Sequence, residues 1–416
     1  MENAKFRRIM ADRYPIILID EYQDTDSDWV EAIKTHFLGK EGSPLFGFFG
    51  DHWQKIYGDG CGKLEHAAVK VIGKEANFRS VGAVVDSLNR MRPELPQFVE
   101  DLDAPGEVQV FHTNNWLGQR QTGAHWGGDL PSDIGHETLT RVKQRLTENG
   151  WDLSSEKTKI LMLTHRVLAN EQGYTSLPGV FRYNEAFTKK EHPYIEYLVD
   201  VLEPACDAYL DRKFGRMFEA LKSKVPLLRG HGDKEAWAKA MDELIVLRED
   251  ATVGQIIDHL RDTKKPRLPD TINDRERELR SFDRESDEEM PRILIEVEKL
   301  RAVHYSELKA LRSYHDGHSP FETKHGVKGA EFENVLVVVG RGWNRYNFGE
   351  MLELAGAAAV PAARQEAFER NRNLFYVVCS RPKKRLALLF TQTLSPAALT
   401  TISHWFGEAN IEPLAF

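Results

Sequence analysis

Cysteine is scarce in this sequence, and long apolar stretches are missing. The chain has 3 cysteines among 416 residues, Cys61, Cys206 and Cys379, and they lie far apart. This spacing excludes a disulfide framework and the paired-cysteine pattern of a zinc site. No apolar run approaches the length that crosses a bilayer, and the first residues lack the apolar core of a signal peptide. The sequence therefore predicts a cytoplasmic protein without a membrane partner.

An excess of positive charge is missing too. Asp and Glu number 64 against 56 for Lys and Arg, which gives a formal net charge of −8. This balance argues against a protein that is basic over its whole surface, but it leaves room for a local basic groove along a nucleic-acid path. The content of 41% hydrophobic and 29% charged residues is that of a globular protein, and the length allows two or three domains.

The sequence does contain an apolar run that stops on two adjacent carboxylates. Residues 16–19 are Ile-Ile-Leu-Ile, and Asp20 and Glu21 follow directly. We expect a buried strand of a parallel sheet that brings both carboxylates to its carboxyl end, where open α/β sheets bind ligands. In a nucleotide hydrolase the first carboxylate can hold Mg²⁺ and the second can polarise the attacking water. A solvated strand end is the simpler alternative.

A second apolar strand, residues 45–49, runs into Gly-Asp-His-Trp-Gln-Lys-Ile-Tyr, which contains Trp53, Gln54 and Tyr57. A Gln amide can donate to a phosphate oxygen and change partners without changing its charge. An ordinary loop amide is the alternative for Gln54. The tetrapeptide Asn-Phe-Arg-Ser follows at 77–80, where the arginine is open to a surface salt bridge as its alternative role.

The middle of the chain changes character. A strand at 107–112, a helix at 136–149 and a strand at 157–164 that ends near Arg166 continue the α/β alternation, and 114–134 is an irregular loop. From 168 to 319 strand signals vanish, and apolar residues recur at helical spacing, which indicates the core of a helix bundle.

Two parts of this helical block have their own patterns. The charge-rich residues 263–289, with Arg-Glu-Arg-Glu at 275–278, predict a solvated linker or an exposed helix face. Residues 292–315 predict one long helix.

Polar residues that could take part in binding or catalysis occur again after the helical block. The sequence Glu-Thr-Lys-His-Gly-Val-Lys-Gly-Ala-Glu-Phe-Glu-Asn, residues 322–334, precedes an apolar strand at 335–339. Further on, Leu-Phe-Tyr-Val-Val-Cys-Ser-Arg ends at Arg381, just before a strand at 386–390. A contact to nucleic acid or to solvent is the alternative for that arginine.

Together, in this order, the segments resemble motifs II to VI of superfamily 1 DNA helicases of the UvrD/Rep type. The resemblance extends from Tyr14 to Leu386 apart from the helical block. It implies an α/β protein with two RecA-like parallel-sheet domains, the first incomplete, and an all-helical insertion in the second. The implied parts are residues 1–75 for the remnant of the first domain, 76–167 and 320–416 for the second, and 168–319 for the insertion.

The resemblance also implies a role for each motif residue. It implies that four residues are catalytic, namely Asp20, Glu21, Gln54 and Arg381. Among them, Asp20 is the implied Mg²⁺ ligand, Gln54 the implied γ-phosphate sensor and Arg381 the implied arginine finger. It also implies that four residues bind ATP: Phe78 at the adenine, Arg79 at the γ-phosphate, Gly329 beside a phosphate and Glu331 at the ribose. It assigns contacts with DNA to Trp53, Tyr57, Thr323 and His325.

The implied activity is that of an ATP-dependent DNA helicase or translocase, with ATP and Mg²⁺ as cofactors, DNA as partner and 3′ to 5′ movement. The motif sequences are more similar to those of UvrD-like helicases encoded beside OLD-family nucleases in phage-defence loci such as Gabija. Such a nuclease is therefore an expected partner. The alternative is a non-catalytic DNA-binding or scaffolding subunit of a nuclease–helicase defence complex.

The sequence departs from the family pattern in two places. Residues 58–64, Gly-Asp-Gly-Cys-Gly-Lys-Leu, replace a usual aromatic-Arg-Gly-Ala stretch that helps hold single-stranded DNA. No glycine-rich loop ending in Gly-Lys-Ser or Gly-Lys-Thr occurs, although such a loop cradles the β and γ phosphates. We therefore expect the 416 residues to be a shortened piece of a longer helicase, with weak ATP binding on their own; a naturally short subunit is the alternative.

Overall fold

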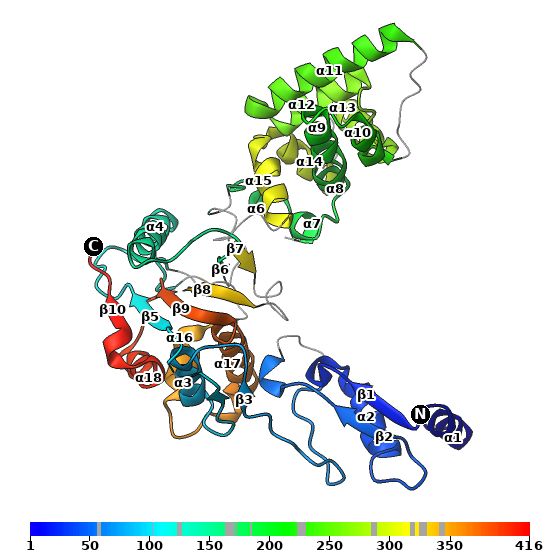
Figure 1. Ribbon diagram of the computed structural model, residues 1–416. Helices are drawn as coiled ribbons and strands as arrows, with labels where there is room; N and C mark the ends of the chain where they lie inside the picture. The colour runs from blue at the N-terminus through cyan, green and yellow to red at the C-terminus, as the bar shows by residue number, and fades with distance from the viewer. Residues whose placement is uncertain are drawn as a thin grey trace. The chain divides into compact units, whose positions relative to one another are not determined.

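The computed structural model describes residues 1–55, 60–101, 103–122, 127–162, 171, 173–183, 185–222, 230–283, 289–316, 321–323, 331–340 and 346–416. The chain divides into two compact units (Figure 1). The first combines Met1–Thr164 with Glu322–Phe416, and the second is His165–Phe321. Within the described ranges, no helix has both the length and the apolar character needed to cross a bilayer.

The first unit alternates strands and helices. Its elements before residue 164 are α1 (Ala4–Arg13), β1 (Ile16–Ile19), η1 (Tyr22–Asp24), α2 (Ser27–His36), β2 (Leu45–Phe48), η2 (His52–Gln54), β3 (Ala76–Asn77), α3 (Gly82–Met91), β4 (Phe98–Val99), β5 (Glu107–His112), α4 (Ser132–Glu148) and β6 (Thr158–Met162). Those from residue 321 onward are β7 (Phe321–Thr323), β8 (Phe332–Val339), α16 (Phe348–Ala355), η5 (Ala362–Arg364), α17 (Gln365–Cys379), β9 (Pro382–Phe390), α18 (Pro396–Phe406), η6 (Glu408–Asn410) and β10 (Ile411–Pro413).

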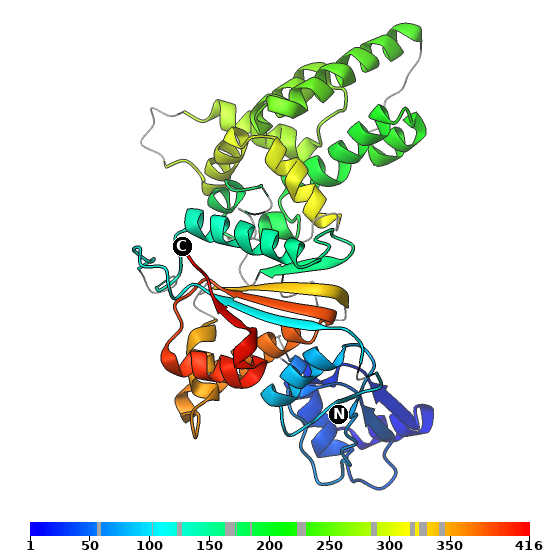
Figure 2. The ribbon, with the colours of Figure 1, turned by 60° about the vertical axis from the view of Figure 1, so that its left-hand side comes forward.

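The main sheet has the strand order β10-β5-β9-β8-β6-β7, and the pairs from β10 to β6 are parallel. Its centre is β8, where Val337 lies opposite Leu161 of β6 and Leu388 of β9. Side chains on both faces of β8 are buried, as expected for a parallel strand covered on each side. Figure 2 shows α4 over one face of this sheet and α3, α17 and α18 over the other. The α/β fold class is therefore as predicted.

A separate sheet pairs β1 with β2 in parallel, and here the expectation of a buried strand was wrong. Successive strand residues point to opposite faces. Ile17 and Ile19 are half-buried, whereas Ile16 is 59% and Leu18 66% exposed. Phe46 of β2 packs against Phe37, which directly follows α2, so one face of the sheet is covered. On the other face, Ile16, Leu18 and Leu45 are largely exposed to solvent.

The second unit is helical. Its described elements are α6 (Leu177–Val180), α7 (Glu185–Thr188), α8 (Pro193–Tyr197), the π-helical turn η3 (Leu198–Leu202), α9 (Glu203–Leu210), α10 (Phe214–Ala220), α11 (His231–Asp250), α12 (Val253–Thr263), α13 (Asp270–Ser281), α14 (Arg292–Ala302) and α15 (Ser306–His315). Their apolar stripes form one shared core, and it includes Ile195, Leu244, Ile257 and Leu308. The assignment of these units to named motor domains stays a prediction.

Two expectations about this unit need correction. The single long helix predicted at 292–315 is two helices, because the residues between them pair with the start of α12 instead. Val253 donates its backbone N–H to the Val303 carbonyl at 2.8 Å, and Tyr305 donates to the Ala251 carbonyl at 2.8 Å. The charged stretch at 275–278 is not wholly solvated either, since Glu276 on α13 is buried and accepts a hydrogen bond from Arg301 at 2.6 Å.

Candidate functional site

The acidic pair lies directly after β1 and is exposed on the surface of the first unit. The Asp20 carboxylate accepts the backbone N–H of Glu21 at 2.9 Å. Glu21 has a left-handed backbone with φ of 47°, an uncommon conformation for a residue with a side chain. This sharp bend turns the chain into η1, where the buried Gln23 donates a hydrogen bond from Nε2 to the Glu21 carboxylate.

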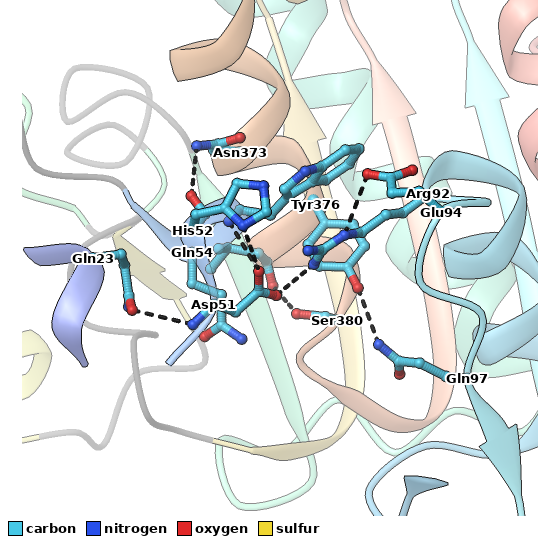
Figure 3. Close-up of polar contacts among 12 residues, drawn as sticks. Gln23, Asp51, His52, Gln54, Arg92, Glu94, Gln97, Asn373, Tyr376 and Ser380 are labelled. Carbon is cyan, nitrogen blue, oxygen red and sulfur yellow. Dashed lines mark hydrogen bonds and ion pairs between the residues drawn. The ribbon is translucent and has the colours of Figure 1, made fainter. Parts of the chain in front are cut away.

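Gln23 ties the acidic pair to the loop after β2. Its Oε1 accepts the backbone N–H of Asp51 at 3.1 Å (Figure 3), and Tyr22 donates its backbone N–H to the Phe49 carbonyl at 3.0 Å. Gly50 makes this approach possible, because a Cβ there would lie 2.2 Å from Gln23 Oε1. Its φ of +146° also favours glycine. The carboxylates and the second loop therefore form one connected piece.

The loop after β2 closes into the short helix η2, which ends at Gln54. Asp51 caps this turn, because its Oδ1 accepts the backbone N–H of Trp53 at 3.0 Å. From the end of the turn, Gln54 Oε1 accepts a hydrogen bond from Nη2 of Arg381 at 3.2 Å. The structure thus brings together two sequence-predicted residues that are more than three hundred positions apart.

Arg381 follows α17 and immediately precedes β9, with only 1% of its surface exposed. Its Nε donates to the Val377 carbonyl at 3.1 Å, which anchors the side chain on the last turn of α17. Burial, together with the nearby positive charge of Arg79, lowers the pKa of Arg381 to about 10. The negative charges of Glu21 and Glu331 act on this pKa in the opposite direction.

Arg79 lies in the turn that follows β3. Asn77 shapes this turn, because its Oδ1 accepts the backbone N–H groups of Arg79 and Ser80, each at 2.9 Å. Arg79 then donates from Nε to the Glu331 carboxylate at 2.9 Å and from Nη1 to the Ser380 carbonyl at 3.3 Å. These contacts place Arg79 beside the residue that precedes Arg381.

Glu331 stands immediately before β8, on the same edge of the sheet as Arg381. Lys383 forms a second ion pair with it, at 3.1 Å. The hydrogen bonds from Arg79 and Lys383 lower the pKa of Glu331. The carboxylate therefore stays ionised below the pH at which a free glutamate takes up a proton.

Phe78 is 76% exposed, and the Lys74 ammonium lies 5.7 Å from the centre of its ring. A ring this exposed leaves room for a planar partner to stack on it. Trp53 is different, because it is only 5% exposed. The Arg372 and Arg92 guanidinium groups lie 3.8 and 4.9 Å from its ring centre, and the Tyr376 ring packs edge-on at 5.1 Å. In this structure Trp53 is a packed residue, and stacking on a DNA base would require those contacts to open.

The structure does not test every predicted position. Thr323 belongs to the backbone of β7, where its side chain is not described. The other predicted positions that fall outside the described residues are Tyr57, His325 and Gly329.

Several residues of this cluster escaped the sequence reasoning. Gln23 carried a signal, because it directly follows the acidic segment, but its bracing role depends on the distant Gly50. The sequence showed Asp51 only as part of the Gly-Asp pair at positions 50 and 51, without indicating its contacts. Arg92 had no signal at all, since a single arginine between a helix and a proline has no distinguishing pattern.

The family resemblance implies ATP and Mg²⁺, and the residues present fit a phosphate group. Arg79 donates to the carbonyl of Ser380, the neighbour of Arg381, and its positive charge adds to burial in lowering the pKa of Arg381. An anion near both positive charges is favoured, because it relieves the repulsion between them. Asp20 is exposed and suits Mg²⁺, which proteins often hold with one or two carboxylates plus phosphate oxygens. Within the described part of the chain, no three acidic, His or Cys side chains group as an all-protein metal site.

Comparison with known proteins supports the family resemblance. Residues 11–393 match the protein family described as "UvrD-like helicase C-terminal domain". The chain is also 24% identical over 449 aligned positions to "Gabija protein GajB" of Bacillus cereus (strain HuB5-5). That alignment covers 97% of this chain and 62% of the relative, so the chain spans less than two thirds of the relative's length.

Proposed function

The chain belongs to the UvrD-like helicase C-terminal domain family, and from this membership we propose that it works as part of an ATP-driven DNA helicase motor. One observation carries the proposal. Gln54 accepts a hydrogen bond from Arg381, Arg79 donates to Glu331 and to the Ser380 carbonyl next to Arg381, and the charge of Glu21 acts on the pKa of Arg381. A cluster that joins an acidic pair, an amide and two guanidinium groups has the parts that phosphoryl transfer needs.

Each residue has a distinct task in this proposal. The carboxylate of Asp20 would hold Mg²⁺, and that of Glu21, oriented by Gln23, would accept a proton from water. Arg79 and Arg381 would stabilise negative charge, and Gln54 would exchange its bond to Arg381 for one to a phosphate oxygen. Bound ATP·Mg²⁺ would supply the phosphoryl group and the metal's charge neutralisation.

The ring of Phe78 would carry the adenine, and single-stranded DNA would be the track along which the motor moves from 3′ to 5′. The similarity to a protein named for Gabija supports a place in a phage-defence system of that type.

The proposal is tested by measuring the affinity of this chain for ATP with Mg²⁺, using a fluorescent ATP analogue, and ATP hydrolysis with and without single-stranded DNA. Arg79→Ala should weaken ATP binding tenfold or more, because charge-assisted hydrogen bonds to phosphate contribute about 1.5–3 kcal/mol. Phe78→Ala should weaken it severalfold without affecting the fold, because the ring is exposed.

Lys384→Ala is the matched control. Lys384 is a neighbouring cation on β9, and it pairs with Glu333 at 3.1 Å rather than with Glu331. Its loss should leave ATP affinity unchanged. Equal losses in Lys384→Ala and Arg79→Ala would show only a general effect of charge. ATP binding that ignores both Arg79→Ala and Phe78→Ala would refute the proposed site.

A second candidate function rests on the open face of the β1–β2 sheet. Ile16, Leu18 and Leu45 are 59%, 66% and 68% exposed there, and neighbouring exposed apolar side chains mark surfaces that bind partners. In this alternative the chain is a non-catalytic DNA-binding or scaffolding subunit of a Gabija-type complex, and an OLD-family nuclease is its partner. Co-purification with such a nuclease that Leu18→Lys abolishes, while ATP has no effect, would favour this alternative.

A further inference from the structure

Arg92 is the first residue after α3, and its guanidinium is buried among residues of the η2 turn and α17. Its Nη1 donates to Asp51 Oδ2 at 2.7 Å, and its Nε lies 3.5 Å from the Glu94 carboxylate. The guanidinium also lies 4.9 Å from the centre of the Trp53 ring and 5.7 Å from that of Tyr376. A charged group is thus held between an ion pair and two aromatic rings.

A second guanidinium packs against the same indole ring. Arg372 lies 3.8 Å from the Trp53 ring centre, and its side chain donates a hydrogen bond to Asn373 at 3.1 Å. Burying two guanidinium groups costs free energy, and apolar side chains of similar volume often stabilise a protein as well or better. We therefore expect this arrangement to specify geometry more than to add stability.

The geometry that it specifies is that of the η2 turn. Asp51 uses one carboxylate oxygen to cap Trp53 and the other to accept from Arg92. From α17, Asn373 Nδ2 donates to the carbonyls of His52 and Lys55 at 3.2 and 3.3 Å. Figure 3 shows Asp51 at the centre of these contacts, with Gln23 on one side and Arg92 on the other. The turn is held from both sides, and Gln54 at its end reaches Arg381.

We propose that Arg92 is a positioning residue for the motor. Its pairing with Asp51 and its packing on Trp53 hold the η2 turn in the orientation in which Gln54 contacts Arg381. If the contact between Arg92 and Asp51 were lost, Gln54 would no longer be held against Arg381. The inference rests on the proposed function for the roles of Gln54 and Arg381, whereas the link from Arg92 to the turn stands on the contacts alone.

The experiment compares Arg92→Lys with Arg90→Lys by hydrogen–deuterium exchange of the whole chain without nucleotide. Lysine keeps the charge but loses the planar fork that donates and stacks. Arg90, two residues earlier on α3, is exposed and serves as the control.

In Arg92→Lys, the amides of residues 51–55 should exchange about tenfold faster, because the loss of a buried charged hydrogen bond favours local opening. Exchange within α3 should stay unchanged, and Arg90→Lys should match the wild type.

Unchanged exchange at 51–55 would overturn the proposal. Equal acceleration through α3 and the turn would overturn it as well, because that result describes a general stabilising residue. If Arg92→Lys does not fold, Asp51→Asn removes the same ion pair with little change of shape and is measured on the same segment.

ATP hydrolysis adds an independent measurement. If the wild-type chain hydrolyses ATP, Arg92→Lys should lower kcat severalfold with a similar KM, because Gln54 is misplaced for the chemical step rather than for binding. The exchange result is measured without nucleotide, so it decides the role of Arg92 independently of the test of the proposed function.

Discussion

Replacement of Gly50 by alanine tests whether the acidic pair and the η2 turn form one connected piece. Gly50 lies between β2 and Asp51, and a Cβ there would be 2.2 Å from Gln23 Oε1 and 3.1 Å from Tyr22 Cδ1. The Gln23 side chain would have to move, and it would then lose its bond to the Asp51 N–H.

The size of the effect follows from two contributions. Alanine at a φ of +146° costs about 1–3 kcal/mol in backbone strain. A buried amide oxygen that loses a hydrogen-bond partner costs about 1–3 kcal/mol more. Gly50→Ala should therefore raise the free energy of this segment by about 2–6 kcal/mol.

Native-state hydrogen exchange of residues 17–24 and 46–55 measures this change as a lower free energy of local opening. The control is Gly42→Ala, since Gly42 also has a positive φ, of +71°, but has no neighbouring atom within 4 Å of a Cβ. That variant should show backbone strain alone, about 1–2 kcal/mol. Equal effects in the two variants would refute the steric argument, and with it the link through Gln23.

Two further results are expected in the helical unit. Glu203→Ala should destabilise this unit by about 3–5 kcal/mol in chemical denaturation, because it leaves Arg248 buried without its bidentate carboxylate. The control Glu278→Ala breaks an exposed ion pair and should cost less than about 1 kcal/mol. Similar losses of stability in the two variants would contradict the burial argument. Burial lowers the pKa of His192 to about 4. Between pH 6.5 and 4 the unfolded chain therefore binds a proton at His192 that the folded chain does not bind. The free energy of unfolding should fall by about 3 kcal/mol as the pH drops through this window. His192→Phe should flatten that dependence in melts at several pH values, and an unchanged slope would show that another group is responsible.

Local patterns in the sequence predicted most of the elements that carry the site. The strands β2, β6, β8 and β9 begin and end within four residues of the predicted ranges, because continuous apolar runs between turn residues leave few alternatives. The break in the helix predicted at 292–315 was missed. It depends on backbone pairing with Ala251 and Val253, and a helical period in the sequence cannot show a distant partner.

For the site, the motif text named Gln54, Arg79, Glu331 and Arg381, and the structure brings these side chains together. It did not indicate that Trp53, expected to face DNA, would be packed between arginines. A tryptophan in a loop reads the same way in the sequence whether its ring is free or covered.

The sequence by itself determined which chemical groups are present and in what order, because motifs are local arrangements of residue types. The carboxylates, the amide and the arginines could all be named from their immediate neighbours. Only the tertiary structure decided which of them meet and what holds them. The contact between Gln54 and Arg381, the hydrogen bond of Gln23 with Asp51 and the ion pair of Arg92 with Asp51 each join residues that lie far apart along the chain, and burial lowers the pKa of Arg381. Such contacts depend on distance in space, and no local pattern of residues encodes that distance.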